Sequence, residues 1–191
     1  MTGMFVTSVV GIGLVVAGVS KLRDLDAHGR VVVGYKILPD RLAFRVGRVL
    51  PFLEVALGAA FIARVALQPT SWAIAALFLA YAAGLSVNLL RGRTELDCGC
   101  FAFGSHEAPR ITWWHTARAL AFAGAAALAP VLPGPDTLTE AMTAVALAGL
   151  AVVLAFGVGS VLSTLTLGRS RVDTYLQPAR TELHRRQAGS V

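Results

Sequence analysis

Cys98 and Cys100 are the only two cysteines of this 191-residue chain, and a single glycine separates them. Two thiols so close together form a disulfide ring tighter than that of a Cys-x-x-Cys pair. Departure from relaxed geometry makes a disulfide easier to reduce, and Gly99 gives the backbone freedom to close the ring. So short a loop adds little stability, so the spacing favours thiol–disulfide exchange over structural cross-linking.

The residues around the pair leave its chemistry partly open. Asp97 disfavours a neighbouring thiolate, whereas Arg91, Arg93 and His106 favour one. The sequence assigns neither cysteine as the attacking or the resolving thiol. Two alternatives to exchange remain: a soft-metal site, for which two sulfurs are an incomplete ligand set, and a non-catalytic assembly subunit in which the cysteines are inert.

Long apolar runs dominate the rest of the chain. Hydrophobic residues make up 55% and charged residues 15% of the composition, and the mean hydropathy is +0.67. Residues 49–90 and 119–168 carry only two charged residues each. This pattern excludes a disordered chain and a secreted disulfide scaffold, and it indicates helices that cross a lipid bilayer.

We predict an all-α integral membrane protein with five transmembrane helices, a four-helix-bundle-like core plus a fifth helix. The expected spans are 4–20, 49–67, 71–90, 112–130 and 139–167. Residues 1–168 form this bundle, with a cysteine loop at 91–111, and residues 169–191 form a basic tail. We expect Pro51 near the start of the second span and a tight turn at residues 68–70.

The stretch 24–48 is too polar to span and is either an interfacial amphipathic segment or a solvated loop. Small residues allow close packing of the spans; they are Gly11, Gly13, Ala17, Gly18, Gly58, Ala59 and Ala60.

The basic residues follow the predicted topology. With five spans, one membrane face receives residues 21–48, the cysteine loop and the tail, and these carry 15 of the 17 lysines and arginines. By the positive-inside rule that face is cytoplasmic, so the N-terminus is outside and the tail and cysteine loop lie at the cytoplasmic face of the cell membrane. The net charge of +6 is then explained by the basic residues that accumulate at the cytoplasmic face. We therefore expect the lipid bilayer rather than a nucleic acid as partner.

The same topology gathers further polar residues at the cytoplasmic face: Lys21, Glu54, Asn88, His115 and Arg118. Buried charges need partners in a membrane. We therefore hypothesise that Lys21, Glu54 and Arg118 form a polar floor beneath the cysteines, and that Glu54 or His115 relays the proton of thiol exchange. The alternatives are a purely structural pair for Glu54, an interfacial histidine and a snorkelling Arg118.

Five stretches together resemble the MauE family of membrane proteins, which is grouped with DoxX-like redox-associated proteins. They are residues 19–24, residues 34–39, residues 50–54 with Gly58, residues 88–93, and Asp97-Cys98-Gly99-Cys100-Phe101. The similarity extends from about residue 5 to residue 165, and the Cys-Gly-Cys-Phe block is its specific part. The family usually has glycine after the phenylalanine, whereas this chain has Ala102-Phe103-Gly104.

The resemblance implies thiol–disulfide handling beside a thioredoxin-like or other thiol partner, during maturation of a disulfide-rich enzyme outside the cytoplasm. It also suggests a relation to four-helix membrane bundles of the quinone-linked vitamin K epoxide reductase type. No motif here requires a cofactor, and quinone use stays open. Because the charge count places the cysteines at the cytoplasmic face, either the pair takes electrons from cytoplasmic thiols or the charge rule misleads.

Overall fold

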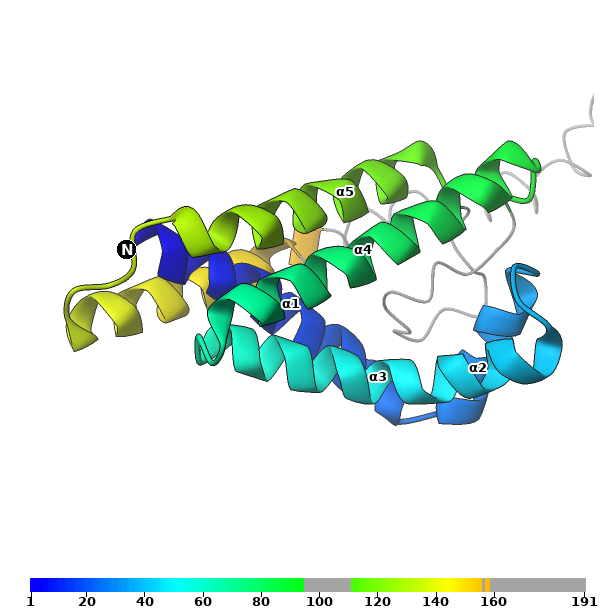
Figure 1. The fold of residues 1–191 in the computed structure, drawn as a ribbon, viewed down its shortest axis with the longest axis horizontal. Coiled ribbons are helices and arrows are strands. Elements are labelled where there is room, and N and C mark those ends of the chain that lie inside the picture. Colours follow the sequence, from blue (N-terminus) through cyan, green and yellow to red (C-terminus); the bar gives the residue numbers. More distant parts are fainter. Residues whose placement is uncertain (95–110, 156, 159–191) are drawn as a thin grey trace, which may run out of the picture. The chain divides into compact units, whose positions relative to one another are not determined.

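The computed structural model describes residues 1–94, 111–155, 157 and 158, and every regular element among them is a helix. The chain divides into two units, Met1–Leu150 and Ala151–Val191; the packing and the sites described below belong to the first. Figure 1 shows its elements in order: α1 (Thr2–Leu22), α2 (Leu25–Gly34), α3 (Asp40–Ile62), α4 (Leu67–Leu90), α5 (Trp113–Leu128), the short 3₁₀ turn η1 (Ala129–Val131), and a last helix that begins at Leu138.

Helices α1 and α3 pack against each other through glycines. A methyl group on Gly11 would lie 2.7 Å from the carbonyl oxygen of Gly58, and one on Gly18 would lie 2.8 Å from that of Pro51. The backbones approach this closely because no side chain separates them. The predicted packing role is confirmed for these glycines, but Gly13 faces none of the described atoms within 4 Å.

A core of apolar side chains joins these two helices to α4 and α5. Its buried members are Val10, Leu14, Phe61, Ile74, Ala75, Leu77, Ala126 and Ala129. Helices α4 and α5 run side by side (Figure 1), and Ser71 of α4 donates a hydrogen bond to the carbonyl oxygen of Ala126. This bond satisfies a hydroxyl group that has no water available in the helix interface.

The polar stretch after α1 forms a helical hairpin rather than a solvated loop. The side chain of Asp24 accepts a hydrogen bond of 2.8 Å from the backbone of Ala27 and caps α2. Pro39, with extended backbone, precedes α3. The two helices cross where Gly29 meets Gly47, since a methyl group on Gly47 would lie 2.8 Å from the Cα of Gly29. Of the two alternatives for residues 24–48, the solvated loop is therefore wrong, and α3 begins at Asp40, well before the predicted residue 49.

Two local predictions, one for Pro51 within α3 and one for the turn after α3, are wrong. Pro51 lies inside α3 and is buried, so the helix continues past a residue without an N–H group. The turn between α3 and α4 lies at residues 63–66, where Arg64 and Ala66 have φ of 54° and 44°, and not at residues 68–70, which belong to the first turns of α4. The turn contains no glycine, so its sequence carries no strong signal.

Three helices of the described residues are long and apolar enough to cross a membrane: Thr2–Leu22, Leu67–Leu90 and Leu138–Ala155. The prediction of five spans is not confirmed, because α3 carries a cluster of charges in its first half and α5 has only 16 residues. The predicted fifth span, 139–167, is described only to residue 158, and the predicted tail, 169–191, lies outside the described residues.

Candidate functional site

A buried ion pair joins the end of α1 to the middle of α3. The ammonium nitrogen of Lys21 lies 2.6 Å from Oε1 and 2.8 Å from Oε2 of Glu54. The two side chains are 5% and 1% exposed. Both charges are thus removed from solvent, and each is the partner that the other needs in an apolar surrounding. The sequence-based expectation that Lys21 and Glu54 lie together is met.

Tyr81 of α4 is a third member of this group, which we call the Lys21–Glu54–Tyr81 cluster. Its hydroxyl donates a hydrogen bond of 2.5 Å to Oε1 of Glu54, and its ring centroid lies 5.7 Å from the nitrogen of Lys21. The ring also packs edge-on against Phe78. Tyr81 was not predicted as a site residue, because a tyrosine within an apolar run has no charge to mark it as a partner.

His28 of α2 is buried close to the same cluster and was also missed. Its Nε2 atom has no hydrogen-bond partner among the described residues. Burial, together with the positive charge of Lys21, lowers the pKa of His28 from 6.5 to about 4. The imidazole is therefore neutral at physiological pH, and it adds no second positive charge beside Lys21.

Asn88 and Arg93 form a second polar group at the end of α4. The fully buried Asn88 donates to the carbonyl oxygen of Gly84 and accepts a bond of 3.2 Å from Arg93. Arg93 also donates to the carbonyl oxygens of Gly34, at 3.0 Å, and Tyr35, at 3.4 Å. Arg93 therefore ties the end of α4 to the end of α2, where carbonyl groups lack helical partners.

Asn88 lies two helical turns after Tyr81, so both residues are on one face of α4, separated by about 10 Å along its axis. Buried polar groups thus follow this face of α4 from the Lys21–Glu54–Tyr81 cluster toward the segment after Arg93.

The segment that carries the cysteines is closed at its base. The backbone N–H of Ile111 donates a hydrogen bond of 2.9 Å to the carbonyl oxygen of Thr94, and Ile111 is buried. Residues 95–110 lie between these two anchors. Asp97, Cys98, Cys100 and His106 therefore fall outside the described residues, and the position of the cysteines above a polar floor is untested.

The two polar residues predicted on α5 do not join the Lys21–Glu54–Tyr81 cluster through any described contact. Nδ1 of His115 accepts a bond of 3.1 Å from the backbone N–H of Thr112 and closes the first turn of α5. Arg118 is half-buried and makes no ion pair with the described part of the chain. The structure therefore gives His115 a local structural contact, and among the described residues Tyr81, not Arg118, contacts the Lys21–Glu54 pair.

The described helices also present many large apolar side chains on their outer surfaces, including Phe52, Leu79, Leu120 and Leu128. Apolar surface on this scale needs a non-aqueous neighbour. Together with three helices of spanning length and an ion pair buried between helices, these surfaces define an all-helical membrane protein.

Comparison with known proteins identifies its family. The family profile described as methylamine utilisation protein MauE matches residues 1–132. Methylamine utilization protein MauE of Paracoccus denitrificans is 36% identical over 163 residues, covering 84% of this chain and 86% of the relative. The protein of that name from Methylophilus methylotrophus is 34% identical over 146 residues, covering 75% and 76%. The chain belongs to the MauE family; no solved structure matches it.

Proposed function

We propose that this MauE-family membrane protein exchanges thiols and disulfides through Cys98 and Cys100 with a thioredoxin-like partner, as a component of methylamine utilisation. The observation that carries the proposal is the adjacency of the two thiols within a segment held at its base by Thr94 and Ile111. Cys98 follows Thr94 by only four positions in the sequence, and Thr94 comes shortly after the end of α4, toward which the buried polar groups lead.

The proposed exchange needs no oxidant or reductant other than the partner's two thiols. A thiolate of the reduced partner attacks one sulfur of the Cys98–Cys100 disulfide, forms a mixed disulfide and releases the other cysteine as a thiolate. The partner's second thiolate then attacks the partner's own sulfur in the mixed disulfide and releases the remaining cysteine, so two electrons pass from partner to chain. The two protons lost when the partner's thiols ionise are balanced by protonation of the two cysteine thiolates. The reverse sequence oxidises the partner. A terminal donor or acceptor, including a quinone, is a separate question.

We further propose that the Lys21–Glu54–Tyr81 cluster exchanges protons with the thiols along the polar face of α4. The support is geometric: Glu54 and Tyr81 share a hydrogen bond of 2.5 Å, Asn88 lies on the same helix as Tyr81, and Arg93, just beyond the end of that helix, donates to Asn88. Tyr81→Phe tests this, because it removes the hydroxyl and keeps the ring. We expect the pH profile of disulfide exchange to shift while the helical content stays unchanged; an unaltered profile contradicts the relay.

Trapping of a mixed disulfide tests the central proposal. In Cys98→Ser and Cys100→Ser variants, one sulfur remains to capture the partner, and nothing resolves the bond. We expect at least one variant to accumulate a reducible adduct with a thioredoxin-like protein, and the double variant C98S/C100S to form none. Stoichiometric metal bound through both thiols, without disulfide turnover, would instead indicate the soft-metal alternative. Full function in C98S/C100S would indicate an assembly subunit.

The side of the membrane on which exchange occurs needs its own measurement. With five spans, the distribution of lysines and arginines supports a cytoplasmic cysteine segment and tail. A membrane-impermeant thiol reagent added to intact cells should then leave the reduced cysteines unlabelled until the membrane is opened. A cysteine introduced at Ser170 in a C98S/C100S background provides the control for the tail. Labelling of Cys98 or Cys100 in intact cells contradicts this orientation.

A further inference from the structure

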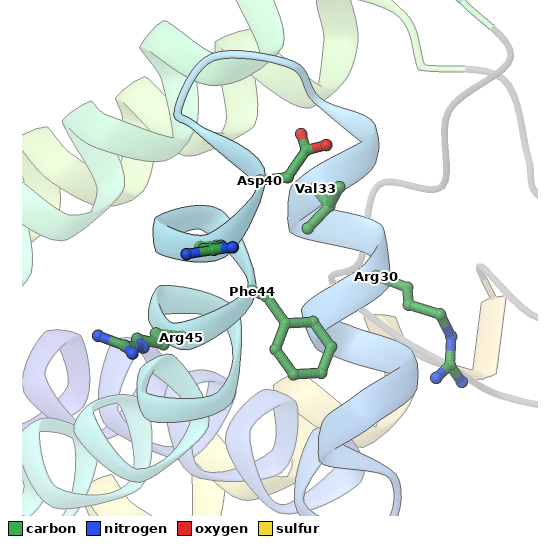
Figure 2. Close-up of a pocket in the computed structure, with 6 residues that line it drawn as sticks. Arg30, Val33, Asp40, Phe44 and Arg45 are labelled. Carbon is green, nitrogen blue, oxygen red and sulfur yellow. The ribbon is translucent and has the colours of Figure 1, made fainter.

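A pocket of about 520 Å³ opens between α2 and α3, away from the Lys21–Glu54–Tyr81 cluster. It is lined by Arg30, Val33, Asp40, Arg41, Phe44 and Arg45. Figure 2 shows the ring of Phe44 between the two helices, with Arg30 on one side of it and Arg45 on the other. The ring rests on the backbone of Gly29, where a methyl group would lie 2.8 Å from its atoms. The pocket therefore has an aromatic floor and arginines at its rim.

Some charged side chains around the pocket form ion pairs, whereas the three lining arginines do not. Asp40 is 3.3 Å from the ammonium group of Lys36, and the neighbouring Arg48 is 3.5 Å from Asp26. Arg30, Arg41 and Arg45 make no hydrogen bond or ion pair with the described residues. The pocket thus retains three guanidinium groups, while its single carboxylate already has a cationic partner. A guanidinium group binds phosphate oxygens through two parallel hydrogen bonds.

The order of exposed side chains along α3 supports a position of this pocket at the level of lipid head groups. Arg41, Arg45 and Arg48 occupy the first half of the helix, and the exposed side chains change to Val49, Phe52 and Leu53 within the next turns. Such a change marks the border between the polar interface and the hydrocarbon region. Exposed Ile37, Leu38 and Leu42 lie beside the basic residues, as expected of a hairpin in the interface.

We propose that this pocket binds the phosphodiester head group of an anionic phospholipid. The negative charge of the phosphodiester is met by the guanidinium groups of Arg30, Arg41 and Arg45. The glycerol region of the lipid contacts Val33 and Phe44. The nearby exposed apolar side chains face the acyl chains. A free phosphate ion fits the arginines alone, whereas the aromatic floor and the adjoining apolar surface favour a lipid. The proposal is independent of the cysteine chemistry and rests on the placement of α2 and α3 at the membrane surface.

Native mass spectrometry of the full-length protein in detergent tests the site, with phosphatidylglycerol and phosphatidylcholine titrated separately. We expect tighter binding of the first phosphatidylglycerol molecule than of phosphatidylcholine. A single R45Q change should weaken phosphatidylglycerol binding about fivefold, since one arginine at an anionic surface contributes about that factor. The R30Q/R41Q/R45Q variant should lose the preference. Val33→Trp, which fills the pocket without altering charge, should weaken binding as well.

The charge-matched control is R169Q/R171Q/R180Q, which removes three arginines from the C-terminal segment. It should keep the phosphatidylglycerol preference, as should C98S/C100S, whose loss of exchange activity concerns the other proposal. Circular dichroism verifies that each variant is folded. Equal weakening by both arginine triples, an unchanged affinity in the pocket triple, or displacement of the lipid by equimolar glycerol 3-phosphate would each overturn the proposal.

Discussion

Lys21 and Glu54 face each other across the contact between α1 and α3, with the ammonium nitrogen between both carboxylate oxygens at 2.6 and 2.8 Å. Thirty-three residues separate them in the chain. The pair lies between the glycine contacts that bring the helices together and the polar end of α4, and Tyr81 completes it. It therefore links the packing of α1, α3 and α4 to a single charged centre.

Removal of one member of this pair should destabilise the protein strongly. Glu54→Leu leaves a buried ammonium group without a counter-charge, and we expect the free energy of unfolding to fall by about 3–5 kcal/mol. The K21M/E54L double variant should lose less than E54L alone, because no charge then remains unpaired. Unfolding by sodium dodecyl sulfate in mixed micelles measures this. The exposed pair Arg48–Asp26 is the control: Arg48→Gln should cost less than about 1 kcal/mol.

Replacement of Gly11 by alanine should disturb the α1–α3 contact. The new methyl group would meet Ile62 at 2.6 Å and the carbonyl oxygen of Gly58 at 2.7 Å, so the helices must separate. We expect a loss of about 1–3 kcal/mol in the free energy of unfolding. Gly13→Ala lies on the same helix and meets no described atom within 4 Å, so it should be neutral or slightly stabilising. Similar effects of both changes would contradict the helix contact.

Acidification should weaken the fold through His28. Its pKa is about 4 in the folded protein and 6.5 in the unfolded chain, so between these values the unfolded state binds more protons. The contribution of His28 is complete above pH 6.5, and it decreases by about 1.4 kcal/mol per pH unit as the pH falls toward 4. Unfolding free energies measured from pH 7 to pH 4.5 should show this slope. His28→Leu should reduce it, and an identical slope in that variant would exclude His28 as its origin.

Arg93 should control the local opening of two helix ends. It donates to the carbonyl oxygens of Gly34 and Tyr35 and to Asn88, and charge-assisted bonds contribute about 1.5–3 kcal/mol each. In Arg93→Gln we expect amide hydrogen exchange at the ends of α2 and α4 to accelerate at least about tenfold. Arg91→Gln, which loses one bond to the carbonyl oxygen of Lys36, should have a smaller effect. Equal acceleration in both variants would contradict the anchoring role of Arg93.

The helical class and the Lys21–Glu54 pair could be predicted from the sequence, because a carboxylate and an ammonium group in apolar helices have few other solutions. Tyr81 could not, since its side chain satisfies an apolar pattern as well as a polar one. Its spacing of seven residues from Asn88 is the only sequence signal that both lie on one helix face.

The helix boundaries that were predicted at the wrong residues, at the start of α3 and between α3 and α4, also have local explanations. Asp24 and the Pro39–Asp40 step are recognisable helix starts, but the high charge of this stretch argues only against a membrane span and does not by itself indicate helices. At the α3–α4 connection, Pro69 resembles a turn residue, while the turn itself uses left-handed Arg64 and Ala66. Tertiary packing imposes that backbone, and a single sequence does not reveal it. The site around Cys98 and Cys100 still rests on the sequence alone.

Pro51 has a consequence for the shape of α3. Lacking an N–H group, it leaves the carbonyl oxygen of Gly47 without its helical donor, at the point where arginines on α3 give way to apolar side chains. A change of angle at this position therefore has one helical hydrogen bond fewer to break. The half of α3 that follows Pro51 can change its angle to the first half at a lower cost than an uninterrupted helix would require.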